Sequence, residues 1–163
     1  MSLPIRRIES AEEILECATF MATANPWNRL RFTVEQCRAH LAHPAVEVHG
    51  TIGERNEIEG FLASMALGVG FEPLLEYICV REGIRGRGVG TLLIDFFETS
   101  LFPSADNLYV FVSDINPDAA RLYSRLGYTQ VGALPNYNLP MQTEFLLRKT
   151  RRPRQSEPTT RSR

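Results

Sequence analysis

The sequence predicts one mixed α/β domain, in which about seven strands form a sheet and about four helices pack against it. Three observations carry this prediction. The 163 residues are the length of one typical domain. Apolar residues recur with the periods of strands and of amphipathic helices. The resulting order, β-α-α-β-β-β-α-β-α-β-β, is typical of a sheet with helices on its faces.

The first two helices are predicted from their start signals. Ser10 with Glu13 three residues later forms a capping-box pattern. Thr33 starts a second helix that ends near Leu41, and residues 23–32 form the loop before it. The two later helices are predicted at 88–101 and 117–126.

The strands are predicted from runs in which apolar and polar residues alternate. Glycine and proline mark two connections, a flexible segment over 68–73 and a long, rigid loop over 134–140. The strands themselves are expected at 5–8, 46–52, 58–67, 74–80, 108–112, 128–133 and 145–149.

Composition excludes several classes of protein. No apolar run is long enough to span a bilayer and the N-terminus lacks a signal-peptide core, so we expect a cytoplasmic protein with no membrane partner. Cys17, Cys37 and Cys79 are odd in number and scattered, so no disulfide framework is expected. Cys37, His40 and His43 lie at helical spacing but form no set of four ligands, so no metal is expected.

Charge is distributed unevenly along the chain. Seven of the 18 basic residues but only one of the 19 acidic residues lie from Arg148 onward, which leaves residues 1–147 with 11 basic and 18 acidic groups, a net charge of −7. Such a body repels a nucleic-acid backbone and attracts cationic amines, so no nucleic-acid partner is expected. We interpret residues 1–149 as one domain and residues 150–163 as a basic, disordered tail.

The most informative motif is the glycine-rich run Arg85-Gly86-Arg87-Gly88-Val89-Gly90, which follows the apolar run 74–80 and opens a helix. Glycines let the backbone approach a bulky group without a Cβ clash. N–H groups at a helix start favour phosphate oxygens, and the two arginines add cationic, fork-shaped donors. The run therefore predicts a site for a phosphate-bearing ligand. A tight turn with solvated arginines is the alternative.

The glycine spacing excludes two common phosphate loops. Glycines at alternate positions do not fit G-x-G-x-x-G, and the only lysine of the chain, Lys149, lies too far away for a P-loop. Arg85, Gly88 and Gly90 do fit R/Q-x-x-G-x-G/A. That is the pyrophosphate-binding signature of the GNAT superfamily of N-acetyltransferases, which this chain resembles.

A second run supports the resemblance. Asn116, followed by an alanine pair, by Tyr123 and by the closing Leu126-Gly127-Tyr128, is similar to the next signature of the family in order and spacing. The resemblance covers roughly residues 46–149.

The resemblance implies a GNAT-like fold with a twisted, mostly antiparallel central sheet. It also implies an N-acetyltransferase that uses acetyl-CoA and transfers the acetyl group directly in a ternary complex. The acceptor would be a primary amine of a small molecule or of a protein. A non-catalytic acyl-CoA-binding module with the same fold is the alternative, and association into a homodimer is left open.

The resemblance assigns the acetyl-CoA site to three segments. The glycine-rich run would hold the pyrophosphate, the strand end at 78–80 would pair with the pantetheine arm, and the backbone of Val80 would face the thioester carbonyl. Asn116 has a competing role as a helix N-cap. The candidate cofactor-binding residues are Ile78, Cys79, Val80, Arg85, Gly86, Arg87, Gly88, Val89, Gly90, Thr91, Asn116 and Tyr123.

Two side chains are candidates for proton transfer. Glu76 lies in an otherwise apolar strand, where burial would raise its pKa toward neutrality as a base requires. A structural carboxylate paired with an arginine is the alternative, and Glu72 is the second candidate base. By the resemblance Tyr123 lies near the thioester sulfur as the acid, its alternative role being a helix–sheet contact. Cys79 is not expected to be a nucleophile, because no histidine lies beside it to activate the thiol.

The resemblance also indicates the acceptor side of the site. In GNAT folds the connection between the first two helices borders the acceptor. Trp27, Arg29 and Phe32 are therefore candidate substrate-binding residues, although a lone tryptophan in a loop is often a packing anchor. Glu72 and Tyr137 complete the predicted set.

Overall fold

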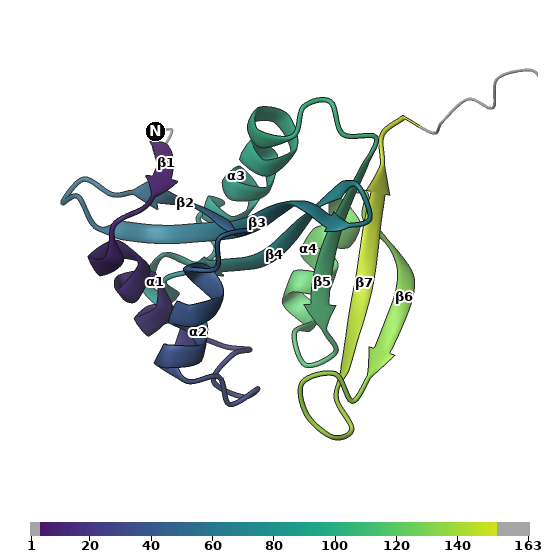
Figure 1. The fold of residues 1–163 in the computed structure, drawn as a ribbon, viewed down its shortest axis with the longest axis horizontal. Helices are drawn as coiled ribbons and strands as arrows, with labels where there is room; N and C mark the ends of the chain where they lie inside the picture. The colour runs from purple at the N-terminus through teal and green to yellow at the C-terminus, as the bar shows by residue number, and fades with distance from the viewer. Residues whose placement is uncertain (1–3, 153–163) are drawn as a thin grey trace, which may run out of the picture.

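The computed structural model of the protein describes residues 4–152 and confirms the predicted mixed α/β fold (Figure 1). Its strands form one 7-stranded sheet in the order β1-β2-β3-β4-β5-β7-β6. Neighbouring strands are antiparallel except β4 and β5, which run parallel. The elements are β1 (Ile5–Ile8), α1 (Ala11–Thr23), α2 (Val34–Leu41), β2 (Glu47–Ile52), β3 (Ile58–Val69), β4 (Glu72–Val80), α3 (Val89–Phe96), β5 (Asn107–Ser113), α4 (Pro117–Arg125), β6 (Thr129–Pro135) and β7 (Thr143–Thr150).

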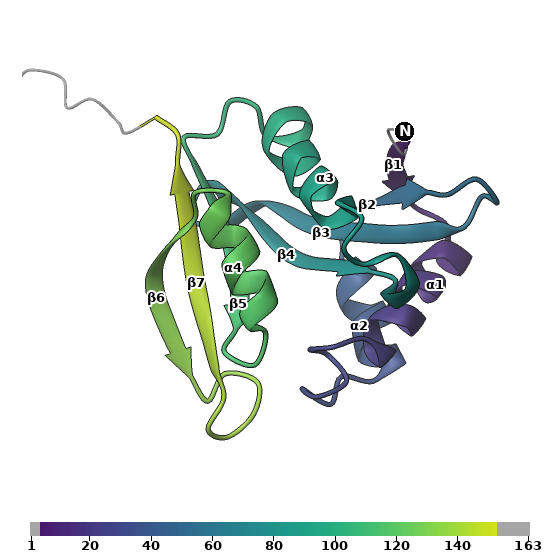
Figure 2. The same ribbon diagram turned by 180° about the vertical axis from the view of Figure 1, so that it is seen from behind.

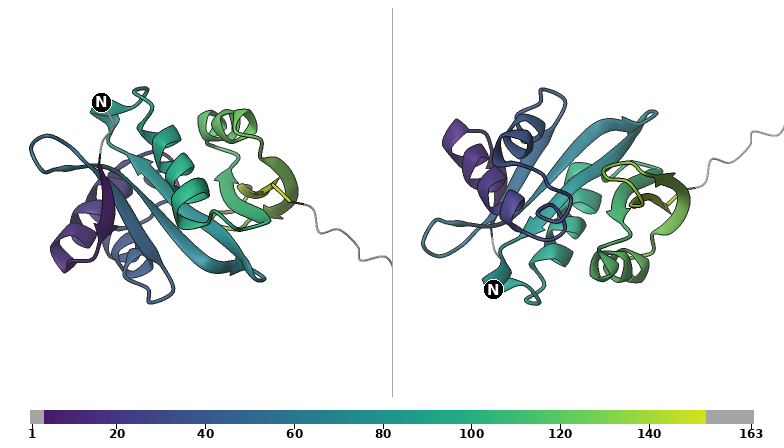
Figure 3. Two further views of the ribbon diagram at one scale, coloured as in Figure 1. Left: turned by 90° about the horizontal axis from the view of Figure 1, so that it is seen from above. Right: turned by 90° about the horizontal axis from the view of Figure 1, so that it is seen from below.

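The helices cover both faces of the sheet, so the protein has two hydrophobic cores. Helices α1 and α2 pack on one face, and α3 and α4 lie on the other (Figures 2 and 3). Adjacent residues of β3 separate accordingly, because Phe61 lies in the first core and Leu62 in the second. No helix within residues 4–152 is long and apolar enough to cross a membrane.

The first two helices begin where their capping patterns predict. The Glu13 N–H donates to Ser10 Oγ at 3.2 Å, which caps α1. Thr33 and Gln36 form a complete capping box at α2, each side chain accepting from the other residue's N–H.

Strand β4 carries a bulge at Glu76. Tyr77 pairs with Ala63 of β3 while Leu75 pairs with Ser64, which leaves Glu76 without a partner on β3. The extra residue shifts the alternation of side chains, so Leu75 packs into the α3/α4 core and Tyr77 into the α1/α2 core. A bulge bends the strand and redirects the side chain that it inserts.

Strands β4 and β5 separate beyond the bulge. Their ladder contains only Leu74↔Tyr109 and Leu75↔Val110, and Figure 1 shows β2–β4 running across the view while β5–β7 run down it. Residues 78–80 pair with β3 on one side, and no strand within residues 4–152 pairs with their other edge. Such an edge offers backbone donors and acceptors to an extended ligand.

Two predicted connections are shorter than expected. The prediction of a flexible segment at 68–73 is wrong, because β3 and β4 continue up to a tight turn at Gly70, whose φ is 62°. Strand β6 likewise extends to Pro135, inside the predicted second loop. Pairing with a neighbouring strand stabilises these glycine- and proline-containing strand ends. The prediction was wrong because local sequence propensity carries no information about that pairing.

The fold continues past the predicted domain end at residue 149. Strand β7 includes Thr150. The next residue, Arg151, places its guanidinium against the C-terminal end of the π-helical turn Phe97–Leu101, which extends α3. A cation at this position satisfies carbonyls that a helix end leaves free. The rest of the predicted tail, residues 153–163, lies outside the described residues. Arg151 donates to the backbone carbonyls of Glu98 at 2.8 Å, Phe102 at 2.5 Å and Ala105 at 2.7 Å.

We expect Arg151→Ala to lower the free energy of unfolding by about 2–3 kcal/mol, because it leaves several carbonyls without a charged donor. Denaturant unfolding followed by circular dichroism measures the change. Arg152→Ala is the matched control, since Arg152 is exposed and also lies after β7. Equal midpoints for the two variants would show that the Arg151 contacts contribute nothing specific.

Candidate active site

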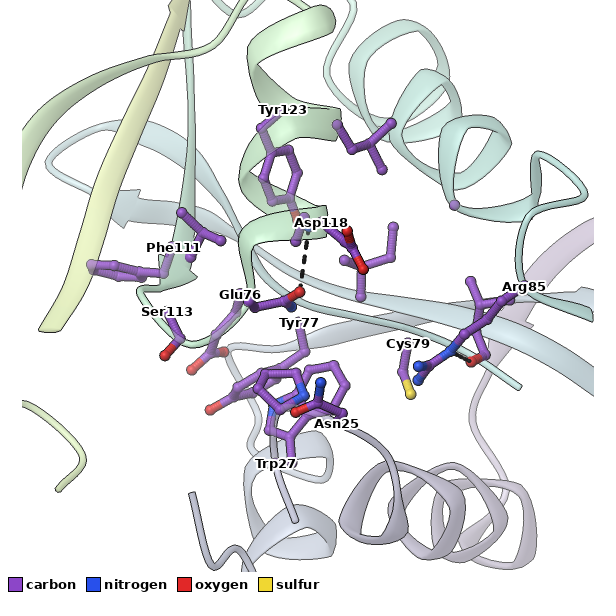
Figure 4. A pocket seen from close by; sticks show the side chains of 18 of the residues that line it. Asn25, Trp27, Glu76, Tyr77, Cys79, Arg85, Phe111, Ser113, Asp118 and Tyr123 are labelled. Carbon is purple, nitrogen blue, oxygen red and sulfur yellow. Dashed lines mark hydrogen bonds between the residues drawn. The ribbon is translucent and has the colours of Figure 1, made fainter. Parts of the chain in front are cut away.

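A cavity of about 660 Å³ lies where β4 and β5 separate (Figure 4). Its walls come from the α1–α2 loop, the end of β4, the start of α3, the facing parts of β5 and α4, and the β6–β7 loop with β7. The two halves of the sheet diverge and leave a gap between them, and segments far apart in the sequence line that gap. Every predicted cofactor-binding residue except Arg87 lines this cavity.

The glycine-rich run forms one end of the cavity. Gly86 and Gly88 have φ values of 78° and 85°, in the left-handed region that favours glycine. Gly88 is the N-cap of α3 and has no side chain to cap the helix, so among the described residues the first N–H groups of α3 have no capping side chain. Together with the Arg85 guanidinium, these donors form an arrangement suited to phosphate oxygens.

The open edge of β4 forms the floor next to this loop. Arg85 Nε donates to the Val80 carbonyl at 3.1 Å, which links the loop to the strand end. Cys79 is 2% exposed, and burial raises the pKa of its thiol to about 12. The thiol therefore stays protonated near neutral pH, in agreement with the expectation that Cys79 does not act as a nucleophile.

The Glu76 side chain enters the cavity from the bulge in β4 (Figure 4). Its Oε2 atom is buried and has no hydrogen-bond partner within residues 4–152. Burial raises the pKa of this carboxyl group, and the Tyr77 hydroxyl and the charges of His40 and His43 partly oppose the shift. No ion pair in the described part of the chain includes Glu76, so no arginine supports the alternative structural role.

Tyr77 lines the cavity beside Glu76, and His40 supports Tyr77 from outside the cavity lining. The Tyr77 hydroxyl and His40 Nδ1 lie 2.8 Å apart, and the two rings are stacked with 5.9 Å between centroids. His40 also meets the Phe32 ring edge-on. His40 thus belongs to an aromatic cluster, and the described residues contain no group of three or more His, Cys, Asp or Glu side chains that could hold a metal ion.

Helix α4 directs Tyr123 into the cavity from the other side (Figure 4). Tyr123 is 2% exposed, and its ring meets Tyr128 edge-on at 5.7 Å between centroids. Burial raises the pKa of its hydroxyl, which therefore carries a proton near neutral pH. Asn116 caps the same helix, its Oδ1 accepting the Ala119 N–H at 3.3 Å, and also lines the cavity.

The predicted acceptor residues divide into two groups. Trp27, Phe32 and Tyr137 line the cavity, and Trp27 is also a packing anchor of the α1/α2 core. Arg29 does not line it, and its Nη1 donates to the Ile115 carbonyl at 3.4 Å. Glu72 lies at the other end of β4, where it accepts a hydrogen bond from Asn107 at 3.2 Å. The tight turn at Gly70 holds Glu72 away from the bulge, so it is no longer a candidate for this cavity.

A polar group that the sequence does not single out lies on the wall opposite Glu76. Glu144 on β7, Ser113 on β5 and Asn138 in the β6–β7 loop all line the cavity. Glu144 lies just before the predicted strand at 145–149, whereas β7 begins at Thr143 and includes it. A carboxylate inside an apolar strand is the signal that identified Glu76, and the same signal could have identified Glu144.

Comparison with known proteins identifies the family. The sequence pattern of the acetyltransferase (GNAT) domain matches residues 46–130, which is more than half of the chain. The protein therefore belongs to the GNAT acetyltransferase family. No curated protein sequence matches the chain.

Solved structures share the fold at low sequence identity. An aminoglycoside 6′-N-acetyltransferase complexed with coenzyme A is 16% identical, with a TM-score of 0.73 over 94% of this chain and 100% of that one. Arabidopsis thaliana NAA60 in complex with acetyl-CoA is 18% identical, with a TM-score of 0.70 over 91% and 98%. A chimera of the Vibrio cholerae spermidine N-acetyltransferase SpeG and hSSAT is 17% identical, with a TM-score of 0.65 over 91% and 96%.

Proposed function

We propose that this protein is an N-acetyltransferase that moves an acetyl group from acetyl-CoA to a primary amine, by direct transfer in a ternary complex. One observation carries the proposal. The open edge of β4 leads from a glycine-rich helix start to Glu76, and Tyr123 enters the same cavity from α4. A donor site and two proton-transfer groups therefore share one cavity.

The residues at the loop end of the cavity suit the donor. The N–H groups of Val89 and Gly90 and the Arg85 guanidinium would hold the pyrophosphate. The backbone of residues 78–80 would pair with the amides of the pantetheine arm. When bound, acetyl-CoA supplies the activated acyl group as a thioester. Structural neighbours crystallised with coenzyme A or acetyl-CoA support this assignment.

The residues at the bulge suit the proton transfers. An ammonium acceptor must lose a proton before it attacks, and Glu76, with a raised pKa and a free buried oxygen, would take it. The departing thiolate must gain a proton, and the Tyr123 hydroxyl would donate it. The acceptor nitrogen loses its second proton as the amide forms, and that proton would restore the Tyr123 hydroxyl. Glu76 acts at the acceptor nitrogen and Tyr123 acts at the thioester sulfur, so the two groups do not compete for one proton.

The acceptor class follows from charge. The acceptor side holds the carboxylates of Glu76 and Glu144 among aromatic rings, which favours a cationic amine. Structural neighbours described as acetyltransferases of aminoglycosides and of spermidine support such an acceptor.

Release of coenzyme A from acetyl-CoA in the presence of a panel of amines tests the proposal. We expect amine-dependent release at a rate well above hydrolysis. If acetyl-CoA raises the melting temperature but no amine or peptide releases coenzyme A, the protein is a non-catalytic acyl-CoA-binding module.

We expect Glu76→Gln to remove the acid limb from the pH profile of kcat/KM and to lower the neutral-pH rate about 100-fold, the lower end of the range for loss of a general base. In the wild type the base works only when deprotonated, so the rate rises with pH through a pKa above the ordinary carboxyl value. Steady-state assays across the pH range measure the profile. An unchanged acid limb in the variant would assign the base to another group.

The same substitution is expected to raise thermal stability in neutral and mildly alkaline buffer. The folded state holds the Glu76 proton more tightly than the unfolded chain, so stability is lost as the pH rises through the folded-state pKa. Removing the charge relieves that loss, whereas in acid the two proteins should melt alike. A melting temperature that falls at neutral pH would contradict the burial argument.

A further inference from the structure

Glu144 is a buried carboxylate on the acceptor side that takes no part in the proposed proton transfers. It is 6% exposed, lies near the start of β7 and lines the cavity opposite β4. It pairs across the ladder with Ser113 at the end of β5. A carboxylate in such a place is costly unless hydrogen bonds or a cation stabilise its charge.

Two neutral amides hold the Glu144 carboxylate in position. Asn138 Nδ2 donates to Oε1 at 2.9 Å and Gln142 Nε2 donates to the same atom at 3.0 Å. Gln142 Nε2 also donates to Ser113 Oγ at 3.0 Å, which ties the group to β5. Burial raises the pKa of Glu144, and the donors from Asn138, Ser113 and Gln142 lower it in part, so they favour the charged form.

No cation of the described chain neutralises Glu144. Arg85 and Arg125 also line the cavity, but within residues 4–152 neither forms an ion pair with it. Its charge is therefore compensated by neutral dipoles alone. A ligand cation would complete the set of partners.

An aromatic pair stands next to Glu144 on the same wall. The rings of Phe111 and Tyr137 are stacked, with centroids 6.1 Å apart and planes inclined by 17°. Phe111 lies two residues before Ser113 on β5, so both side chains leave the same face of that strand, and Figure 4 draws both among the cavity side chains. Aromatic faces attract ammonium groups. Tyr137 is 61% exposed, so the contribution of this pair is the smaller one of an exposed site.

The separation of Glu144 from Glu76 sets the kind of cation. Leu75 of β4 pairs with Val110, and Glu144 pairs two strands away with Ser113. Ordinary strand spacing and rise place the backbones of Glu76 and Glu144 roughly 12 Å apart before the strands diverge. The charges that shift the pKa of each carboxyl group do not include the other carboxylate, although Asp114 raises the pKa of Glu144. The two side chains are therefore separate sites, which two amino groups several bonds apart in one molecule would reach. Glu76 Oε2 lacks a partner in the same cavity, which leaves both ends available.

We propose that Glu144, flanked by the Phe111–Tyr137 pair, is a subsite for a second protonated amino group of the acceptor, and that the acceptor is a diamine-type dication. This inference rests on the proposed acetyl transfer, which identifies the other amino group as the one that is acetylated. Glu76 receives the amine that reacts, and Glu144 holds the distal ammonium and so fixes the orientation of the molecule. Glu144 is a specificity-determining residue and takes no part in the proton transfers.

Two matched series of compounds test the subsite: linear diaminoalkanes from diaminobutane to diaminodecane, and the monoamines of the same chain lengths. We expect kcat/KM of the wild type to favour the diamines, with an optimum at one length. Glu144→Gln should lower kcat/KM for the best diamine by about 10- to 100-fold, the usual range for one hydrogen bond to a charged group. The matching monoamine should change less than about 2-fold, since it makes no contact at Glu144.

Glu54→Gln is the matched control, because it removes the same charge from an exposed turn outside the cavity. An equal loss for diamines and monoamines in Glu144→Gln would overturn the subsite, as would a wild type without diamine preference.

Calorimetric binding of the same compounds to the coenzyme A-loaded protein separates this inference from the proposed function. Tighter diamine binding that Glu144→Gln removes supports the subsite even if no amine is acetylated. Acetylation of monoamines and diamines with equal binding would instead support the transferase and reject the subsite.

Discussion

Gly90→Glu is expected to abolish the stabilisation of the protein by acetyl-CoA while leaving the unliganded protein at least as stable as the wild type. Gly90 lies in the first turn of α3, lines the cavity and has an ordinary φ. A Cβ atom there would meet Leu122 at 3.8 Å and Val80 at 3.9 Å, which are normal contacts. The new side chain therefore fits the fold.

The two effects have opposite signs for a physical reason. A carboxylate in the first helical turn interacts favourably with the helix dipole, and replacing glycine inside a helix adds up to about 1 kcal/mol. The same carboxylate would repel a pyrophosphate and occupy its donors. Losing two charge-assisted hydrogen bonds of about 1.5 kcal/mol each corresponds to roughly 100-fold weaker binding.

Thermal melting with and without acetyl-CoA measures both effects. Gly83→Glu is the matched control, since Gly83 is exposed, lies in the turn before the loop, has open space around its Cβ position and does not line the cavity. It adds the same charge a few residues away and should keep the full acetyl-CoA shift. If Gly90→Glu keeps that shift as well, the pyrophosphate does not bind at the start of α3.

Tyr123→Phe is expected to lower kcat about 100-fold, the lower range for loss of a general acid. The affinity for acetyl-CoA should change little, because the substitution removes one oxygen and keeps the ring that packs against Tyr128. The raised pKa of the Tyr123 hydroxyl keeps it protonated over the working pH range, so the wild-type rate should show no loss from its ionisation near neutrality.

Tyr128→Phe is the control for this experiment. Tyr128 is as buried as Tyr123 and touches its ring, but it does not line the cavity. Single-turnover rates at saturating acetyl-CoA separate chemistry from product release. Equal rates for Tyr123→Phe and the wild type would remove Tyr123 from the proton transfer, and equal losses for both variants would indicate a packing effect.

Much of the fold was predictable because its signals are local. Capping residues, helix-period apolar residues and the glycine-rich run each act within one turn or one strand. Helices α1 and α2 and the start of α3 therefore appear where the sequence predicts them. The failures at 68–73 and at the start of β7 both concern strand ends, whose extent depends on a partner strand far away in sequence.

The site was predictable to the extent that its residues belong to those local signals. Arg85, Gly88, Gly90 and Tyr123 could be named from spacing. Glu72 and Arg29 also looked suitable in the sequence, and only the tight turn at Gly70 and the bond from Arg29 to Ile115 take them away from the cavity. The sequence indicated Glu144 only weakly, because the role of a carboxylate depends on which side chains face it in the folded protein.

The sequence by itself determined the family of the protein and the end of the cavity that suits a donor, because glycines and helix starts act through the backbone of a few consecutive residues. The tertiary structure decided the other end. The bulge at Glu76 and the early separation of β4 from β5 create the cavity. They place Glu76 on one wall of the cavity and Glu144 on the opposite wall. Which charges face one another is a property of strand pairing between distant segments, and no local pattern encodes it.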